Sequence, residues 1–405
     1  MVPSAGRQIV LINAAHFLTH YTLLILPTAV LVMARPGGEF GSEYGPVLAL
    51  ATAMVVLYGA GSLPQGWLAA RIGRKALMVG FGLGTGASLI SAGLVSGPIG
   101  LAVSLGLAGL FTAIYHPIGT AMLVEAAGAQ PGKSIGVNGV FGNLGVASAP
   151  IVTAFLAGHY DWRAAFIAPG AFAIILGLLW WREPVQDHSA HFASRPFPTI
   201  PAFLVRRAVI VLLSVAVVSG LIFNAFTLLL PKLMEERLAG DASLLPIIGT
   251  LAFLVTICGA MTQFSVGRLI DRTTLRSLFL PLALVLAPAL GALSFAQGWL
   301  VLPLAGLTAA TIFGQVTVNE TMTARYISPA LRTKMYSVRF FVGFLGAAAA
   351  APLVAFLHER TGNLTAVTLV LAAVALVTLG CAMFFPNRPE ELKPELWERA
   401  AVPAE

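Results

Sequence analysis

The hydrophobic residues of this chain are grouped in long, nearly continuous runs, and polar residues are mostly confined to the short stretches between them. Gly and Pro occur inside the runs, as they do in membrane helices, where neighbouring helices compensate for the interrupted backbone. A helix needs about 20 mostly apolar residues to cross a bilayer. Twelve runs meet this length: 9–33, 46–70, 76–96, 98–126, 134–158, 162–181, 208–231, 243–267, 276–296, 299–327, 335–357 and 363–385. The pattern predicts an all-α membrane protein with twelve transmembrane helices.

The longest hydrophilic stretch lies between the sixth and seventh runs and is rich in Pro, Ser and His, a composition typical of linkers. It divides the chain into four parts. We expect an N-terminal six-helix bundle (1–182), a cytoplasmic linker (183–207), a C-terminal six-helix bundle (208–386) and a cytoplasmic tail (387–405).

The two halves resemble each other when the sequence is shifted by 201 residues. Gly66 then matches Gly267, Arg71 matches Arg272, and the run from 141 to 156 lies over the run from 342 to 357. Any one match between apolar helices is weak evidence, but a single offset holds across two separated segments. The repeat predicts two pseudo-symmetric bundles with the same orientation in the membrane and a substrate site between them at mid-depth.

Composition agrees with a chain that faces lipid, because 58% of its residues are hydrophobic and 10% are charged, whereas a soluble domain has about 25% charged residues. The formal net charge of +7 is spread over the short linkers, which does not favour a nucleic-acid partner. With the N-terminus in the cytoplasm, 18 Lys and Arg residues fall in cytoplasmic segments and 5 in outer segments. This bias predicts that both termini are cytoplasmic, as in a protein of the bacterial inner membrane.

The first apolar run is too long for the core of a signal peptide, and we interpret it as a retained helix. Two cysteines, Cys258 and Cys381, both lie in apolar runs, so neither a disulfide framework nor a thiolate metal site is expected.

Ionisable residues inside the spans are candidates for function, because an unpaired charge in lipid costs several kcal/mol. Glu320 is the only carboxylate well inside a predicted span, and it is the first candidate for binding and releasing a proton. His20 and His116 are further candidates, since imidazole titrates near neutral pH. The alternatives are a static ion pair of Glu320 with Arg325 or Arg339, and histidines that serve only in packing. We expect His16, one helical turn from His20, to be an interface residue.

Arg339 lies opposite Asn138 in the repeat, in helices expected to line the cavity. A guanidinium at this depth can hold a carboxylate or phosphonate through two hydrogen bonds, which suggests an anionic or zwitterionic substrate. The alternative is a fixed partner for Glu320. The further residues expected to contact substrate are polar or aromatic side chains within the spans, namely Tyr115, Asn143, Asn224, Gln263 and Asn319.

Other chemistries find little support in the sequence. Three histidines could hold a transition metal, but no Cys lies nearby and no His/Asp cluster has ligand spacing, so we expect no metal and no cofactor. The chain lacks a Walker A motif, which argues against direct use of ATP, and it lacks a nucleophile elbow and a metalloprotease signature. We therefore do not expect an enzyme.

Short motifs in the loops resemble those of the major facilitator superfamily. GWLAARIGRK (Gly66–Lys75) resembles the signature G-x-L-x-D-R-x-G-R-R, and GRLIDRTTLR (Gly267–Arg276) resembles its second copy. DWRAAF (Asp161–Phe166) is similar to the W-R-x-x-F entry to the sixth helix. The resemblance covers the whole chain and implies secondary transport by a fold that is usually sufficient as a monomer.

Three further segments resemble the fosmidomycin-resistance branch of drug exporters within this superfamily. They are AHFLTHY (Ala15–Tyr21), YHPIGTAML (Tyr115–Leu123) and IGVNGVFGNLGVASAP (Ile135–Pro150). Related uptake carriers share parts of this pattern.

The loop carboxylate of the superfamily signature is replaced by Ala70 in the first half, whereas Asp271 is present in the second. The resemblance implies that this carboxylate pairs across the cytoplasmic side and favours an outward-open state. Asp271 and Arg272 are thus the stronger gating candidates, with Arg71 and Arg74 behind them. The alternative is that both loops only supply positive charge on the cytoplasmic side.

Together these features predict a proton-coupled secondary transporter that exports a small organic compound by alternating access. The first alternative is a proton-linked importer of a small anion or metabolite on the same fold. A receptor or structural membrane protein, in which the polar residues pair statically, is the second.

Overall fold

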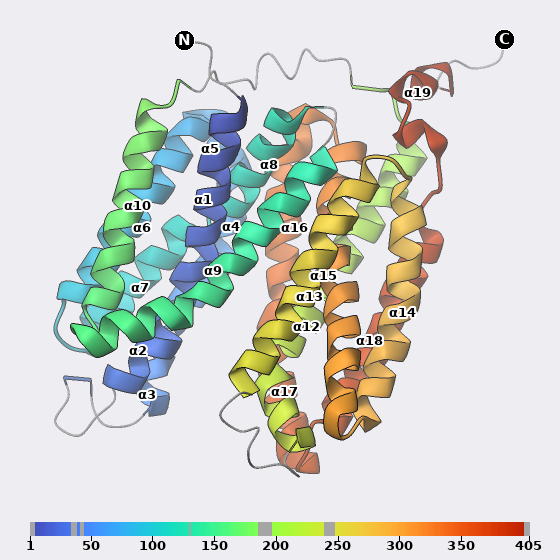
Figure 1. Ribbon diagram of the computed structural model, residues 1–405. Coiled ribbons are helices and arrows are strands. Elements are labelled where there is room, and N and C mark those ends of the chain that lie inside the picture. Colours follow the sequence, from blue (N-terminus) through green and yellow to red (C-terminus); the bar gives the residue numbers. More distant parts are fainter. Residues whose placement is uncertain are drawn as a thin grey trace. The chain divides into compact units, whose positions relative to one another are not determined.

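The computed structural model describes residues 5–33, 39–40, 44–128, 131–184, 197–238 and 248–400. These residues form helices and turns and contain no strand (Figure 1). Residues 185–196 of the expected linker and residues 401–405 of the expected tail lie outside the described residues. The α-helices are α1 (Ala5–Leu23), α2 (Ile25–Met33), α3 (Tyr44–Ala49), α4 (Thr52–Ser62), α5 (Gln65–Ile72), α6 (Arg74–Leu94), α7 (Pro98–Thr112), α8 (Tyr115–Ala127), α9 (Pro131–His159), α10 (Ala164–Arg182), α12 (Ala202–Leu238), α13 (Ile248–Ile270), α14 (Leu275–Phe295), α15 (Val301–Tyr326), α16 (Pro329–Ala348), α17 (Ala350–Thr361), α18 (Thr365–Phe384) and α19 (Pro394–Ala400).

Within the described residues, eleven helical segments are long and apolar enough to cross a membrane. A bent pair, Pro46–Ser62 with Gln65–Ile72, makes a twelfth span if it is taken as one. The predicted all-α membrane fold with twelve spans is thus confirmed. The bend of 62° falls at Pro64, which has no N–H with which to continue the helix.

Proline also explains three milder breaks inside spans. A proline ring clashes with the carbonyl group four residues earlier. Accordingly, α1 ends at Leu23 before Pro27, α7 ends at Thr112 before Pro117, and α16 ends at Ala348 before Pro352. The break before Pro117 matters for the site, since α8 begins anew at Tyr115 and carries two aromatic side chains in its first turn.

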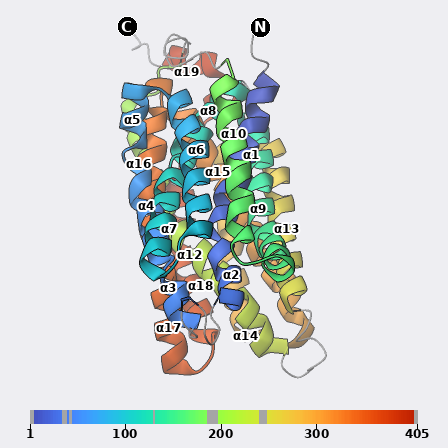
Figure 2. The same cartoon turned by 90° about the vertical axis from the view of Figure 1, so that its left-hand side faces the viewer.

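The two halves repeat the same helix pairings. In the first half α6 packs on α10, α4 on α7 and α6 on α7, and in the second half the equivalent pairs are α14 with α18, α13 with α15 and α14 with α15. Figures 1 and 2 show α6 beside α10. This agreement confirms two pseudo-symmetric bundles. The 201-residue sequence repeat therefore corresponds to a repeat of the helix arrangement.

Contacts between residues divide the chain into two compact units that do not follow the sequence halves strictly. Unit 1 contains Met1–Ala129, Phe141–Arg195 and Pro329–Phe341, and unit 2 contains Gln130–Val140, Pro196–Ser328 and Val342–Glu405. Two helices are therefore shared. The beginning of α9 belongs to unit 2, and the beginning of α16 belongs to unit 1.

Candidate functional site

Three histidines from two helices of unit 1 come together, and we call His16, His20 and His116 the histidine cluster. His16 and His20 lie on one face of α1 because residues four apart are one turn apart. Their Nε2 atoms are 3.1 Å apart. His116 in the first turn of α8 completes the cluster, with ring centroids 5.2 Å from His16 and 5.4 Å from His20. One ligand-type nitrogen from each ring lies within 4.8 Å of the others.

Aromatic rings enclose the histidine cluster. Tyr115 is buried and stacks on His16 at a centroid distance of 4.9 Å. Phe340 of α16 stacks on His116 at 4.3 Å, and Tyr58 of α4 packs edge-on against Phe340 at 5.6 Å. These rings fix the orientation of the imidazoles and reduce the access of water to them.

Two neighbours make the histidine cluster sensitive to charge and to volume. Arg339, which precedes Phe340 in α16, acts electrostatically on His116. Gly142 of α9 faces the ring of His16, where an added Cβ would lie 2.7 Å from Cε1 and 2.8 Å from Nε2. Only glycine leaves this imidazole its present position.

In unit 2, α15 carries a row of polar side chains among apolar ones. Asn319 is buried, and its Oδ1 has no hydrogen-bond partner within the described residues; the same holds for Nε2 of Gln315, one turn earlier. Glu320 follows and is partly exposed. A buried amide with unused hydrogen-bonding capacity is uncommon and can bind a polar ligand or water.

The other expected substrate contacts differ in their surroundings. Asn138 and Gln263 are buried, and both belong to unit 2, where the amide of Gln263 lies against Gly139. Asn143 is partly exposed. Asn224 is exposed, and its Nδ2 donates a hydrogen bond of 2.9 Å to the carbonyl of Gly220 in its own helix. Among these residues, Asn224 therefore has the weakest structural support as a contact for substrate.

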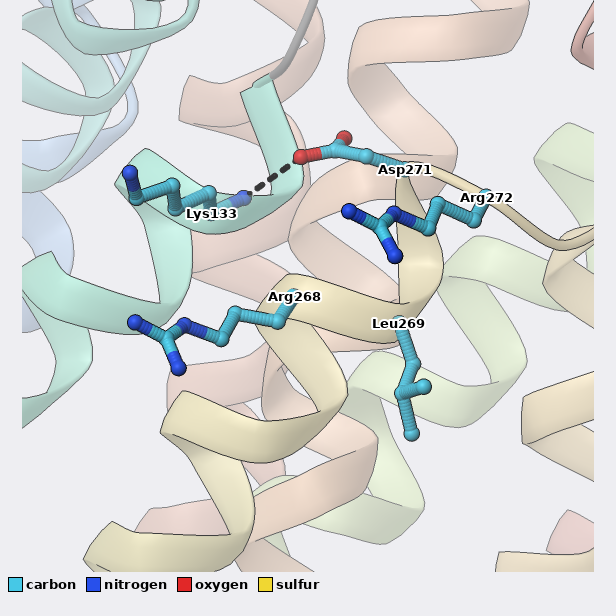
Figure 3. Close-up of a pocket in the computed structure, with 5 residues that line it drawn as sticks. All are labelled: Lys133, Arg268, Leu269, Asp271 and Arg272. Carbon is cyan, nitrogen blue, oxygen red and sulfur yellow. Dashed lines mark hydrogen bonds between the residues drawn. The ribbon is translucent and has the colours of Figure 1, made fainter.

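Asp271 caps the beginning of α9. Its carboxylate accepts hydrogen bonds of 2.9 Å from the backbone N–H groups of Gly132 and Lys133. Negative charge at this end of a helix interacts favourably with the helix dipole. Figure 3 shows the bond from Lys133 beside the side chains of Arg268 and Arg272, which together with Leu269 line a cavity of about 400 Å³.

The two copies of the loop signature make different contacts. Arg71 and Arg272 are exposed, while Arg74 is buried and forms an ion pair of 2.7 Å with Glu125 of α8. The first-half loop has no counterpart of the Asp271 cap, because Ala70 stands at that position. Instead, the backbone N–H of Gly66 donates a hydrogen bond of 2.8 Å to Oγ of Ser337 in α16. A Cβ on Gly66 would lie 2.6 Å from Cα of Lys334, so glycine permits the close approach of α5 and α16.

The C-terminal segment is attached to unit 2 through Glu391, in a short 3-10 turn after α18. Its carboxylate accepts hydrogen bonds from the N–H of Leu275, from Tyr326 and from Arg325, the last at 3.3 Å. Arg325 also donates to the carbonyls of Ile270 and Thr273. Burial raises the pKa of Glu391, although these hydrogen bonds and the charge of Arg325 oppose the shift.

Sequence reasoning did not place His16, Phe340 or Glu391 among the functional residues. The spacing of His16 and His20 was an available signal, because it puts both imidazoles on one helix face. The sequence contains no comparable signal for Phe340 or Glu391, because their partners are more than sixty residues away in the chain. Structure brings His20, Tyr115 and His116 together in unit 1, and Arg339 lies close enough to act on His116.

A bundle of membrane-spanning helices with a repeated half and with ionisable groups inside its spans is an architecture typical of multi-pass membrane transporters. The family model for the Major Facilitator Superfamily matches residues 12–317 and 245–404. The chain therefore belongs to the major facilitator superfamily, whose members bind small solutes and typically use protons, and it is a transporter and not an enzyme.

Solved structures share this fold at low sequence identity. The proton:xylose symporter XylE, bound to 6-bromo-6-deoxy-D-glucose, has a TM-score of 0.75 and 14% identity, with 98% of this chain and 99% of that chain covered. The human organic anion transporter MFSD10 has a TM-score of 0.74 and 18% identity over 94% of this chain and 100% of that chain. The E. coli fucose:proton symporter FucP has a TM-score of 0.70 and 15% identity over 95% and 100%. No curated protein matches the sequence.

Proposed function

We propose that the protein is a proton-coupled exporter of small anionic or zwitterionic organic compounds, which works by alternating access and resembles the fosmidomycin-resistance branch. The observation that carries the proposal is the histidine cluster within electrostatic range of Arg339. It combines proton-binding groups with a cation suited to an anion in one part of the transmembrane region.

Glu320 is the proposed main proton carrier, with His116 and His20 as partners. Its partly exposed position inside a span allows it to exchange protons as access alternates. The static alternative paired Glu320 with Arg325 or Arg339. Arg325 forms an ion pair with Glu391 and donates hydrogen bonds to two backbone carbonyls, which does not favour a fixed pair of Glu320 with Arg325.

Arg339 is proposed to bind the carboxylate or phosphonate of the substrate. The amides of Asn138, Asn143 and Asn319, together with Tyr115, supply neutral hydrogen-bonding groups. Asn319 has the best support among them, because its buried carbonyl oxygen lacks a partner within the described residues.

Gating is proposed to depend on Asp271, whose carboxylate holds the first turn of α9. Since α9 continues into unit 1, release of this cap would free one of the two shared helices. Arg272, Arg71 and Arg74 have supporting roles, and the ion pair of Arg74 with Glu125 stabilises the corresponding loop of the first half.

We further propose that the protein functions as a monomer in the bacterial inner membrane with both termini in the cytoplasm. The excess of Lys and Arg in the segments assigned to the cytoplasm supports this orientation.

The test is a measurement of internal pH in proteoliposomes during addition of a panel of carboxylates, phosphonates and zwitterions. We expect solute-driven proton flux with the native protein and its loss in Glu320→Gln, which keeps the shape of the side chain but cannot ionise. Flux that persists in Glu320→Gln but is lost in His116→Gln would assign the coupling to the histidine cluster. Native protein that binds a solute without proton flux would contradict the proposal.

Proton-linked import is the second candidate, and a specific observation favours it. Two structures with the same fold, FucP and XylE, are proton symporters. Proton-gradient-driven solute flux in proteoliposomes of known orientation separates the two candidates. An inward proton gradient should drive the solute out through an exporter and in through a symporter.

A further inference from the structure

Three imidazoles meet in the histidine cluster, and each offers one nitrogen within 4.8 Å of the others. A metal bound tetrahedrally at about 2.0–2.1 Å from each nitrogen separates its ligand nitrogens by about 3.3 Å. The Nε2 atoms of His16 and His20 are 3.1 Å apart and form a hydrogen bond, so a metal would take the place of the shared proton at a similar spacing. The same geometry places the centroids of coordinating imidazoles about 5.2 Å apart. The three observed separations are 4.9, 5.2 and 5.4 Å.

The surroundings of the three rings also suit a ligand. His116 has a buried Nε2 with no hydrogen-bond partner within the described residues. His16 is buried, whereas His20 and His116 are partly exposed. Two histidines four residues apart on a helix are a frequent basis for a metal site, here joined by a third from α8.

We propose that His16, His20 and His116 bind one divalent transition-metal ion of the class that imidazole prefers, such as Zn²⁺ or Co²⁺. The nearby guanidinium of Arg339 repels a bare dication and attracts an anion. We therefore expect an anionic oxygen, such as a carboxylate, as the fourth ligand of the metal, attracted by the charge of Arg339. The substrate class is accordingly a metal complex of a small organic anion. This assignment of the substrate rests on the proposed transport of anions, whereas the metal site does not.

Metal binding is tested on the purified full chain by calorimetric titration with ZnCl₂ and by the visible d–d bands of Co²⁺, which report tetrahedral coordination. We expect one Zn²⁺ per chain in the native protein. Loss of a ligand in His116→Ala should lower the affinity at least about tenfold. The matched control is His159→Ala, an exposed histidine outside the cluster, which should leave affinity unchanged.

Gly142→Ala keeps all three imidazoles but displaces His16, so it separates loss of geometry from loss of a ligand. It should also weaken Zn²⁺ binding, whereas Gly158→Ala in the same helix, where a Cβ has open space, should not. Melting temperatures without metal identify any variant that fails to fold. Substoichiometric Zn²⁺ binding, or binding that is unaffected in both His116→Ala and Gly142→Ala, overturns the metal site.

The anionic fourth ligand is tested by adding acetate to the Co²⁺-loaded protein. We expect acetate to alter the d–d bands of the native protein, and to have a much smaller effect in Arg339→Gln. An equal effect in both proteins overturns the role of Arg339. Because none of these measurements involves transport, proton-coupled flux without metal binding would refute this inference and leave the proposed function in place.

Discussion

Individual side chains show how this protein carries charge in an apolar environment. Arg74 and Glu125 have 8% and 6% of their side-chain surfaces exposed and form an ion pair of 2.7 Å. Arg325 and Glu391 form another, with 12% and 1% exposed. A buried ion without its partner is strongly unfavourable, so the contribution of each residue to stability depends on its partner.

Removal of one member of the first pair should therefore destabilise the protein. We expect Arg74→Gln or Glu125→Gln to lower the free energy of unfolding by about 3 kcal/mol, because each leaves a buried charge uncompensated. The double variant Arg74→Met/Glu125→Leu should recover much of this loss. Thermal unfolding in detergent measures the effect, and a double variant less stable than both single variants would contradict it.

Glu391 provides a pH-dependent prediction. Burial raises its pKa in the docked segment above the ordinary value of about 4.3, so the docked state binds protons more tightly than the undocked state. The contribution of Glu391 to docking is therefore fully present when the pH is below its ordinary pKa. This contribution is lost as the pH rises through the raised pKa of the docked state. We expect the rate of proteolysis in α19, relative to that of Glu391→Gln, to increase with pH. A ratio that is independent of pH would show that Glu391 does not control docking.

At the scale of helices, α9 is held at its beginning by contacts within unit 2 and continues into unit 1. Its first turn is held by Asp271, and its glycines allow α13 to approach closely, since a Cβ on Gly136 would lie 2.8 Å from the carbonyl oxygen of Gln263. A helix end that is held by one charged cap can unwind easily, because loss of one side-chain interaction leaves several backbone N–H groups without a partner.

Asp271→Asn should loosen the beginning of α9. The amide keeps an acceptor oxygen but loses the negative charge that binds two N–H groups and the helix dipole, a loss of about 1.4 kcal/mol, or about tenfold. We expect the amides of Gly132 and Lys133 to exchange with deuterium about tenfold faster. Peptides from the beginning of α6 serve as the internal control, and unchanged exchange at both amides would exclude Asp271 as the cap in solution.

For the whole molecule, the charge distribution predicts the orientation in the membrane, and the sequence repeat agrees with the repeated helix pairings. Equivalent helices pair in the same way in both halves, and each unit also takes in the beginning of one helix from the other half. The two shared helices, α9 and α16, are the ones whose residues are divided between both units.

Orientation is tested by labelling single cysteines in intact cells, in a chain whose Cys258 and Cys381 are replaced by alanine. We expect a cysteine at Lys393 to react with an impermeant maleimide only after the membrane is opened. A cysteine at Arg360, between the last two spans, should react in intact cells. The opposite pattern would contradict the cytoplasmic placement of the C-terminus.

The sequence by itself determined the class of protein and the positions of the spans. Long apolar runs demand a lipid environment wherever they are placed, and the prolines at 27, 117 and 352 interrupt helices through purely local geometry. The loop motifs predicted the superfamily, and the 201-residue repeat predicted the paired bundles. Both signals can be read by comparing short segments of the sequence.

Only the tertiary structure decided which polar side chains meet. His116 joins His16 and His20 across a hundred residues, Glu391 binds Arg325 instead of leaving it to Glu320, and Asp271 caps a helix that begins 140 residues before it. Such contacts depend on the rotation and depth of each helix in its bundle. These are set by the packing of many small side chains together, and no local pattern of hydrophobic residues encodes them.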